Sequence, residues 1–314
     1  MRASGLSSER FKSIRDSADV VGALNNFFIA QPPIHSGGLY HYTRLDAAKK
    51  ILKDRFLLLS SSRILNDTRE PQEDGLYVVS LSFGAIESVA MWGIYSRPLS
   101  EAVRIRFHHS EIKELARQYH GNICPVAVRK NLGKPEYRIL GDSSSAVILN
   151  EEPQLSDILY VDYVKEKPRR DTASVAVRWN SNSIRIDRCA LESVRRGLLR
   201  RLMKYSGWAY ERETRLCVKA DIDNDKVSDA IRRLSGAGWE LSSDRIALRL
   251  APQIVQHVDV RGGPCLSAEE ISTDFLAEGI EVGRTEESVL RGSVRGGVFC
   301  EGCVKVDGCR ISHH

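Results

Sequence analysis

Apolar residues recur along the chain at two spacings, and each spacing predicts a different kind of element. A repeat of three to four residues places apolar side chains on one face of a helix. This repeat predicts helices at residues 1–30, 45–52, 110–119, 188–205 and 225–234. A later helix is expected to begin at Ser267, which has the spacing of a capping box with Glu270.

Short runs of apolar, β-branched and aromatic residues predict strands. These runs lie at residues 39–43, 56–60, 76–83, 103–107, 158–164, 214–219 and 246–250. Residues 103–107 alternate between apolar and charged, as a half-exposed strand does. Strands and helices interleave without regular βαβ spacing. The expected fold class is therefore α+β, with a mixed, largely antiparallel sheet core and flanking helices.

Loop signals divide the chain into three parts. Residues 1–38 are expected to form a helical preface, residues 39–260 an α+β catalytic-like core, and residues 261–314 a C-terminal helix with a Gly- and Cys-rich tail. Within the core, Asn66 and Asp67 indicate a turn. Residues 283–297 are rich in Gly, Arg and Ser, which predicts a flexible link.

Composition limits the class of protein. The chain has 314 residues, of which 42% are hydrophobic and 28% charged, as is usual for globular proteins. It contains no apolar run of about 18 residues, so no transmembrane helix and no membrane partner are expected. The N-terminal segment lacks the pattern of a signal peptide, which indicates a cytoplasmic protein. Reduced thiols are then expected at Cys124, Cys189, Cys217 and Cys265.

Polar and aromatic residues gather in separate clusters within the predicted core. Such clusters are unusual in a core that has only a structural role. Their order along the chain is Leu39-Tyr-His-Tyr-Thr43, Leu65-Asn-Asp67 with Glu70, Val79-Ser-Leu-Ser82, Met91-Trp92-x-x-Tyr95, and Lys204 ahead of Trp208-x-Tyr210-Glu211-x-Glu213-x-Arg215. On a strand, Glu211 and Glu213 would face the same side, because side chains repeat every two residues. Two such carboxylates repel each other, so the pKa of one is expected to rise.

These motifs, in this order, resemble the DUF2971 family of bacterial proteins over residues 39–255. The same segments resemble, more distantly, the ADP-ribosyltransferase superfamily, which implies an ADP-ribosyltransferase-like sheet and NAD as a substrate. By that resemblance Glu213 is the catalytic carboxylate, with Glu211 nearby to receive a proton. The residues expected to contact NAD are His41, Tyr42, Thr43, Ser80, Ser82, Trp92 and Tyr95.

The chemistry implied by the resemblance suits these residue types. Breaking the bond between ribose and nicotinamide develops oxocarbenium charge on the sugar. A carboxylate that binds the ribose 2′-hydroxyl stabilises this charge where it forms. His41 would contact the adenosine-side ribose, Ser80 or Ser82 would line the nicotinamide pocket, and Tyr95 could stack on nicotinamide.

Each of these features also has a structural interpretation. The alternative for Glu213 is an ion pair with Arg215 on a solvated strand face. The alternative for His41 is a core histidine, and the alternative for Ser80 and Ser82 is hydrogen bonding to the backbone of a buried strand. Trp92 and Tyr95 lie three residues apart, which is also the spacing of core residues on a helix.

Three functions therefore remain open at the level of sequence. The first is an NAD-consuming enzyme with a nucleic-acid or protein acceptor, for which the resemblance implies a setting in bacterial conflict as a toxin or phage-defence effector, with an antitoxin or partner subunit. The second is a non-enzymatic module that binds a nucleotide or nucleic acid. The third is a nuclease in which Glu70, Glu211 and Glu213 hold a divalent metal.

The predicted helix at residues 188–205 carries a basic face that includes Arg196, Arg200 and Arg201. Such a face can bind the phosphates of NAD or of nucleic acid, although a solvated helix face has the same composition. The net charge of +5 permits an acidic partner without requiring one.

The tail contains the residue types of a zinc site, namely Cys300, Cys303, Cys309 and His313. Only five residues separate the second and third of these cysteines, which is not a standard finger spacing. The alternatives are a zinc knuckle, a disordered reduced tail without metal, and histidines that belong to a truncated purification tag.

Overall fold

The computed structural model describes residues 38–65, 70, 72–84, 86–118, 121–130, 135–162, 174–179, 182–187, 201, 203–291, 294–295 and 298–299. Several predictions lie outside these residues: the helical preface, the turn at Asn66 and Asp67, most of the helix at 188–205 with Cys189, and the Cys-rich tail. Among the described residues, no helix is both long and apolar enough to span a bilayer.

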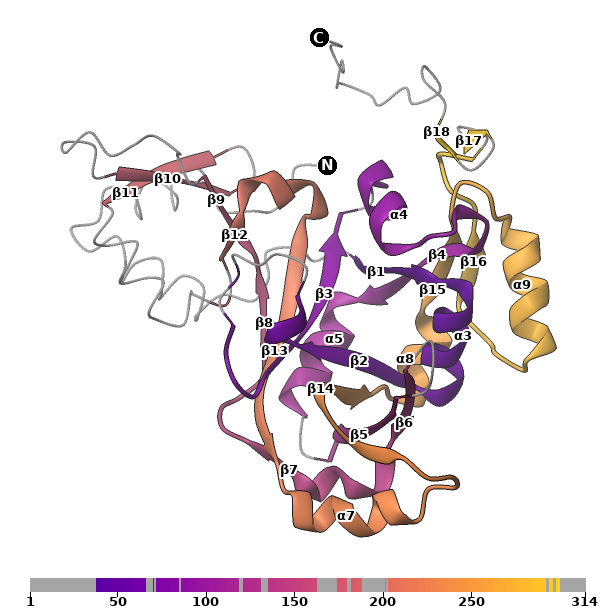
Figure 1. Cartoon of the computed structure of the whole chain (residues 1–314). Coiled ribbons are helices and arrows are strands. Elements are labelled where there is room, and N and C mark those ends of the chain that lie inside the picture. Colours follow the sequence, from indigo (N-terminus) through magenta and orange to yellow (C-terminus); the bar gives the residue numbers. More distant parts are fainter. Residues whose placement is uncertain are drawn as a thin grey trace. The chain divides into compact units, whose positions relative to one another are not determined.

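The described residues form two compact units, and each unit combines stretches that are separate in sequence. The first contains Phe56–Gly84 and His109–Leu250, and the second contains Tyr40–Arg55, Ala85–His108 and the residues after Leu250. Both units are built on a largely antiparallel sheet with helices beside it (Figure 1). The α+β class predicted from the sequence is therefore confirmed.

In the first unit the strand order is β3-β2-β14-β5-β6, and β13 pairs with β3, β7 and β8. All of these pairings are antiparallel. The strands are β2 (Phe56–Ser61), β3 (Leu76–Phe83), β5 (Ile123–Arg129), β6 (Glu136–Ile139), β7 (Val147–Leu149), β8 (Gln154–Asp157), β13 (Glu213–Ile222) and β14 (Trp239–Arg249). The helices are α5 (His109–Arg117) and α7 (Asn224–Arg232), with short 3-10 segments η1 (Ser62–Ile64), η3 (Gly141–Ala146) and η5 (Ser206–Glu211).

A smaller four-stranded sheet also belongs to the first unit, in the order β11-β10-β9-β12. Its strands are β9 (Leu159–Asp162), β10 (Ser174–Trp179), β11 (Asn182–Asp187) and β12 (Met203–Tyr205). The pairing of β12 with β9 is parallel, and the other two pairings are antiparallel. This sheet matters for the site because β12 leads through η5 directly into β13.

In the second unit the strand order is β16-β15-β4-β1. The strands are β1 (Gly38–Arg44, from Tyr40 onwards in this unit), β4 (Ala102–His108), β15 (Asp259–Gly262) and β16 (Arg284–Glu286), with a two-stranded pair β17 (Val294–Arg295) and β18 (Val298–Phe299). The helices are α3 (Leu45–Asp54), α4 (Val89–Tyr95), α8 (Pro252–His257) and α9 (Ala268–Ala277), with the 3-10 segment η2 (Leu99–Glu101). The core of this unit contains Trp92, Phe107 and Phe275, all of them at most 1% exposed.

Local chemistry explains where several elements begin and end. The capping box predicted at Ser267 is confirmed, since its hydroxyl accepts from the Glu270 amide and the Glu270 carboxylate accepts from the Ser267 amide. Asp223 caps α7 in a similar way by accepting from two backbone amides. Gly75 has φ +68, and an added Cβ would lie 2.8 Å from the carbonyl oxygen of Ala220. Glycine therefore allows the close approach of the turn before β3 to β13.

Three predictions about elements were wrong. Residues 203–205 form a strand rather than the end of a helix, because they pair with β9. Strand β4 is buried rather than half exposed, because α3 and α8 pack against it and the charge of Arg104 lies over the ring of Tyr40, 4.3 Å from its centroid. Residues 284–286 are a paired strand, and Ser288 is buried, so this stretch is not a flexible link.

Candidate functional site

A cluster of buried charges lies where β12, η5 and β13 follow one another along the chain. Lys204 on β12 places its Nζ 2.6 Å from Glu211 Oε2 and 3.3 Å from Glu213 Oε2. Glu211 ends η5 and Glu213 begins β13, with Arg212 between them at φ 45. The sequence predicted that the two glutamates lie on the same face of one strand. This prediction was wrong, because the backbone turns at Arg212. The two glutamates converge instead on a single ammonium.

Arg215 and Glu70 extend the cluster into a closed ring of charges. Arg215 donates from Nε to Glu213 Oε1 at 2.7 Å and from Nη1 to Glu70 Oε2 at 2.6 Å. Glu70 Oε1 lies 3.4 Å from Lys204 Nζ, which closes the ring. These side chains are at most 4% exposed. The pairing of Glu213 with Arg215 expected on a solvated strand face is thus present, but it is buried.

The ring determines the charge state of Glu213. Burial by itself would raise the pKa of this carboxyl, but the positive charges of Arg215 and Lys204 outweigh it and lower the pKa to about 2. The same attraction raises the pKa of Lys204 despite the cost of burying it. The sequence predicted a raised pKa for Glu211 or Glu213, whereas the pKa of Glu213 is lowered. At neutral pH it is ionised and does not accept a proton.

Ser80 connects this buried carboxylate to the surface. Strands β3 and β13 pair so that Ser80 lies opposite Arg215 and Ser82 opposite Glu213. Ser80 is exposed, and its hydroxyl donates to Glu213 Oε1. The Ser82 hydroxyl donates to the backbone carbonyl of Glu211, in agreement with the structural interpretation of this serine. Of the two serines, Ser80 therefore contacts the candidate carboxylate.

Two aromatic residues complete the surroundings of the ring. The Tyr160 hydroxyl accepts from the Glu213 amide at 2.9 Å, and the side chain is buried. Lys204 Nζ lies 5.0 Å from the centroid of the Trp208 ring, within the range of a cation–π contact. Sequence reasoning missed Tyr160, because a single tyrosine in a predicted strand carries no signal of its partner.

The second unit contains a different buried polar cluster, centred on Glu87. Its carboxylate accepts from Trp92 Nε1 at 3.1 Å, from Arg261 Nη1 at 2.9 Å and from the Val289 amide at 3.0 Å. Trp92 is fully buried, and its ring meets that of Tyr42 edge to face with 4.8 Å between centroids. Trp92 and Tyr42, which were expected to contact NAD, are core residues in this structure.

The other residues expected to contact NAD are partly exposed. His41, Thr43 and Tyr95 are half-buried residues of β1 and α4. They belong to the second unit, whereas Ser80 and Glu213 belong to the first. Their roles in binding NAD stay predictions.

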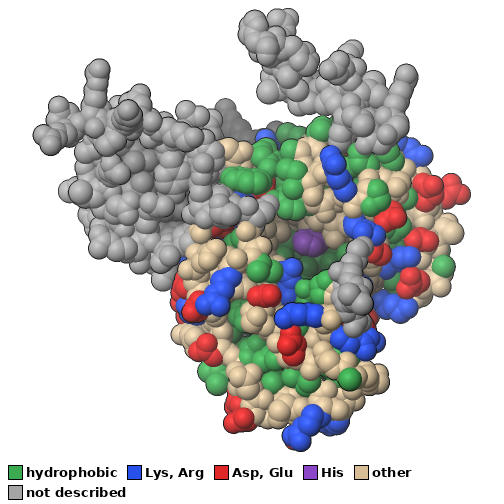
Figure 2. All heavy atoms as spheres, viewed as in Figure 1, with side chains coloured by type: hydrophobic (Ala, Val, Ile, Leu, Met, Phe, Trp, Pro, Cys, Tyr) green, Lys and Arg blue, Asp and Glu red, His purple; other side chains and the backbone are tan. Residues whose placement is uncertain are grey.

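Arg201 is the described member of the predicted basic face, because Arg196 and Arg200 lie outside the described residues. Its guanidinium binds the Glu73 carboxylate at 2.7 and 2.8 Å and also binds Glu151. Arg201 is therefore engaged in an ion-pair network rather than open to phosphate. Figure 2 shows acidic and basic side chains interspersed over the described part of one face, without a large patch of one sign.

A scan against protein-family models, a search of curated proteins and a search of solved structures each found no match for this chain. In the described part of the chain, no three His, Cys, Asp or Glu side chains are grouped closely enough to hold a metal ion. Cys124, Cys217 and Cys265 are free thiols, as predicted.

Proposed function

We propose that this chain is an NAD-consuming enzyme, an ADP-ribosyltransferase or related glycohydrolase, in which Glu213 is the catalytic carboxylate. The observation that supports this proposal is the contact between exposed Ser80 and ionised, buried Glu213 on paired strands. An ADP-ribosyltransferase-like arrangement of the sheet and a cytoplasmic toxin or phage-defence setting belong to the same proposal, as do a protein or nucleic-acid acceptor and an antitoxin or partner subunit.

The charge state of Glu213 suits one part of the reaction. When the bond between ribose C1′ and the nicotinamide nitrogen breaks, its electron pair goes to nicotinamide and positive charge develops on the sugar. A fixed carboxylate stabilises that charge without reorganising. Because its pKa is low, Glu213 acts through its charge and as a hydrogen-bond acceptor. The proton of the attacking water or acceptor therefore goes to another group. The proposed proton acceptor is Glu211, whose carboxylate binds the same lysine, Lys204.

Access to Glu213 runs through Ser80. Glu213 is 1% exposed, so a ribose hydroxyl reaches it only by replacing a donor that already contacts the carboxylate. Arg215 and Lys204 are buried, whereas Ser80 is exposed and can turn its hydroxyl away. The proposed binding step is therefore an exchange of the Ser80 hydroxyl for the 2′-hydroxyl of the substrate.

The test is release of nicotinamide from NAD by the full-length protein and by three variants. Glu213→Gln should lower the rate by roughly 10²–10³, on the scale of one lost electrostatic stabiliser. Ser80→Ala should lower the KM for NAD and leave the maximal rate unchanged, because it removes the donor that the ribose hydroxyl has to displace from Glu213. Glu136→Gln removes an ion-paired carboxylate on edge strand β6 and should leave the rate unchanged. A thermal melt of each variant separates lost activity from lost folding.

Two outcomes would contradict the proposal. Equal rates in wild type and Glu213→Gln, with both folded, would remove Glu213 from the mechanism. No nicotinamide release by the wild type would favour the binding-module function, in which the same residues bind a nucleotide without cleaving it.

A metal-dependent nuclease is the second candidate, because Glu70, Glu211 and Glu213 approach one cation, although as they stand they are not grouped closely enough to hold a metal ion. They converge on Lys204 Nζ, at 3.4, 2.6 and 3.3 Å. A divalent cation at this point would have to displace the ammonium from all three carboxylates. Cleavage of RNA or DNA that depends strictly on Mg²⁺ or Mn²⁺, and that is lost in Glu70→Gln, would favour this candidate over NAD cleavage.

A further inference from the structure

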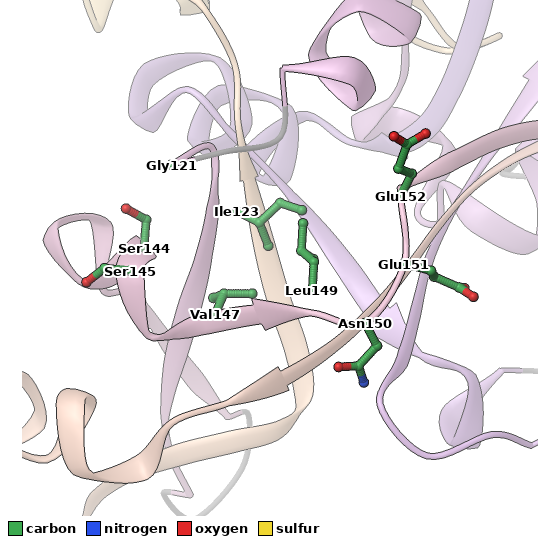
Figure 3. A pocket seen from close by; sticks show the side chains of 9 residues that line it. All are labelled: Gly121, Ile123, Ser144, Ser145, Val147, Leu149, Asn150, Glu151 and Glu152. Carbon is green, nitrogen blue, oxygen red and sulfur yellow. The ribbon is translucent and has the colours of Figure 1, made fainter.

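A cavity of about 560 Å³ opens in the first unit, away from the residues singled out in the sequence (Figure 3). Its apolar part consists of Ile123 on β5 and of Val147 and Leu149 on β7. Cavities of this size, with an apolar floor and a few polar groups, are typical of sites for small ligands. The cavity is therefore large enough to bind a small organic molecule or one side chain of a partner.

Polar groups stand on both sides of this apolar floor. Figure 3 shows Ser144 and Ser145 on one side of it and Glu151 and Glu152 on the other. Among the described residues, the two serine hydroxyls and the Glu152 carboxylate take part in no hydrogen bond or ion pair. The described lining contains no Lys, Arg or His. The cavity thus presents one carboxylate and two hydroxyls that are not used within the fold.

The neighbouring polar residues differ from Glu152 because they already have partners. Arg201 Nη1 binds the Glu151 carboxylate. The Asn150 amide donates to Asp221 at 3.0 Å. The negative charge of Glu151 is therefore compensated within the fold, whereas Glu152 is an exposed residue of the lining, and no cation among the described lining residues balances its charge.

We infer that this cavity binds an organic cation in which a guanidinium or ammonium group is joined to a short apolar stem. The cation pairs with Glu152, and the stem lies over Val147 and Leu149. Polar hydrogens at the far end of the ligand donate to the Ser144 and Ser145 hydroxyls. Two sources share this chemistry, namely a free guanidine or diamine and the arginine or lysine side chain of a protein partner. The inference does not rest on the proposed NAD chemistry.

The experiment is calorimetric titration of the full-length protein with two probes. Agmatine, which joins a guanidinium to an ammonium through four methylenes, represents the free cation. The peptide acetyl-Gly-Arg-Gly-amide represents an arginine side chain on a partner. Binding of either probe should weaken as salt is added, because an exposed carboxylate is screened. Tighter binding of agmatine identifies a small-molecule site, and tighter binding of the peptide identifies a site for a protein partner.

Two variants make the test specific. Glu152→Gln should weaken the preferred probe by about tenfold or more, because a charge-assisted hydrogen bond becomes a neutral one. Glu281→Gln, an exposed carboxylate outside the cavity, should bind as the wild type does. Glu152 makes no hydrogen bond or ion pair with another described residue, so its replacement should leave the melting temperature unchanged. The inference is overturned if neither probe binds at up to about 10 mM, the weak end for a ligand of this size. Equal binding by wild type and Glu152→Gln would also overturn it.

Discussion

The buried ring should make the first unit sensitive to the loss of a single cation, and Arg215→Met tests this. Methionine keeps a long flexible side chain but removes the charge and the donors. Arg215 is 3% exposed, as is Glu70, and Glu213 is 2% exposed. After the substitution both carboxylates stay buried. The remaining cation of the ring is then Lys204, whose Nζ lies 3.4 Å from Glu70 Oε1 and 3.3 Å from Glu213 Oε2.

The expected magnitude follows from these distances and from burial. Two unit charges about 4 Å apart attract by about 4 kcal/mol at an effective dielectric constant of about 20. Arg215 takes part in two such pairs, but its desolvation offsets part of this attraction. Removing one partner of a buried pair costs about 3–5 kcal/mol in measured cases, because the other charge is left uncompensated. We expect the free energy of unfolding to fall by about that amount.

Urea unfolding of wild type and variant measures this change, with Arg232→Met as the matched control. The pair of Arg232 with Asp229 is 75% and 73% exposed, so its loss should change the free energy of unfolding by less than about 1 kcal/mol. Adding Glu70→Gln to Arg215→Met should cost less than the sum of the two single changes, because it removes one of the orphaned charges. A loss no larger than that of the control would refute the reasoning about the ring.

Two further predictions concern stability. A hydrogen bond from Arg201, together with one from Lys219, lowers the pKa of Glu73 from 4.5 to about 2 despite partial burial. The ionised Glu73 carboxylate therefore stabilises the fold fully above pH 4.5, and this stabilisation is lost as the pH falls towards 2. Glu73→Gln should therefore flatten the decline of unfolding free energy measured between about pH 4.5 and pH 2. Gly75→Ala should destabilise more than Gly238→Ala, since both have positive φ but only at Gly75 does the added Cβ meet a backbone oxygen, at 2.8 Å. Gly238→Ala should cost about 1–2 kcal/mol in thermal or urea unfolding, and an equal cost at both positions would contradict the role given to the clash.

The sequence predicted elements better than it predicted contacts between them. The spacing of apolar residues identified α3 and α7, and a run of apolar residues identified β3, each to within a residue or two, because burial selects apolar side chains locally. The sequence prediction placed Glu211 on a strand, because no residue pattern indicates that the backbone turns at Arg212. Glu70 and Arg215 are 145 residues apart in the chain, and no local pattern brings them together. The polar clusters therefore identified members of the ring, while burial and the closing contacts came from the tertiary structure.

The ring also restricts the chemistry that Glu213 can perform. A buried ion pair is weak evidence for stability, because apolar side chains of similar volume often hold a core equally well. What the ring does provide is orientation: Arg215 holds one carboxylate oxygen, Lys204 holds the other, and the charge persists to about pH 2. A carboxylate fixed in this way is a poor general base at neutral pH, because it has almost no affinity for a proton. If it acts on a ligand, it acts by its charge and by accepting a hydrogen bond, and exposed Ser80 is the contact at which such a ligand would arrive.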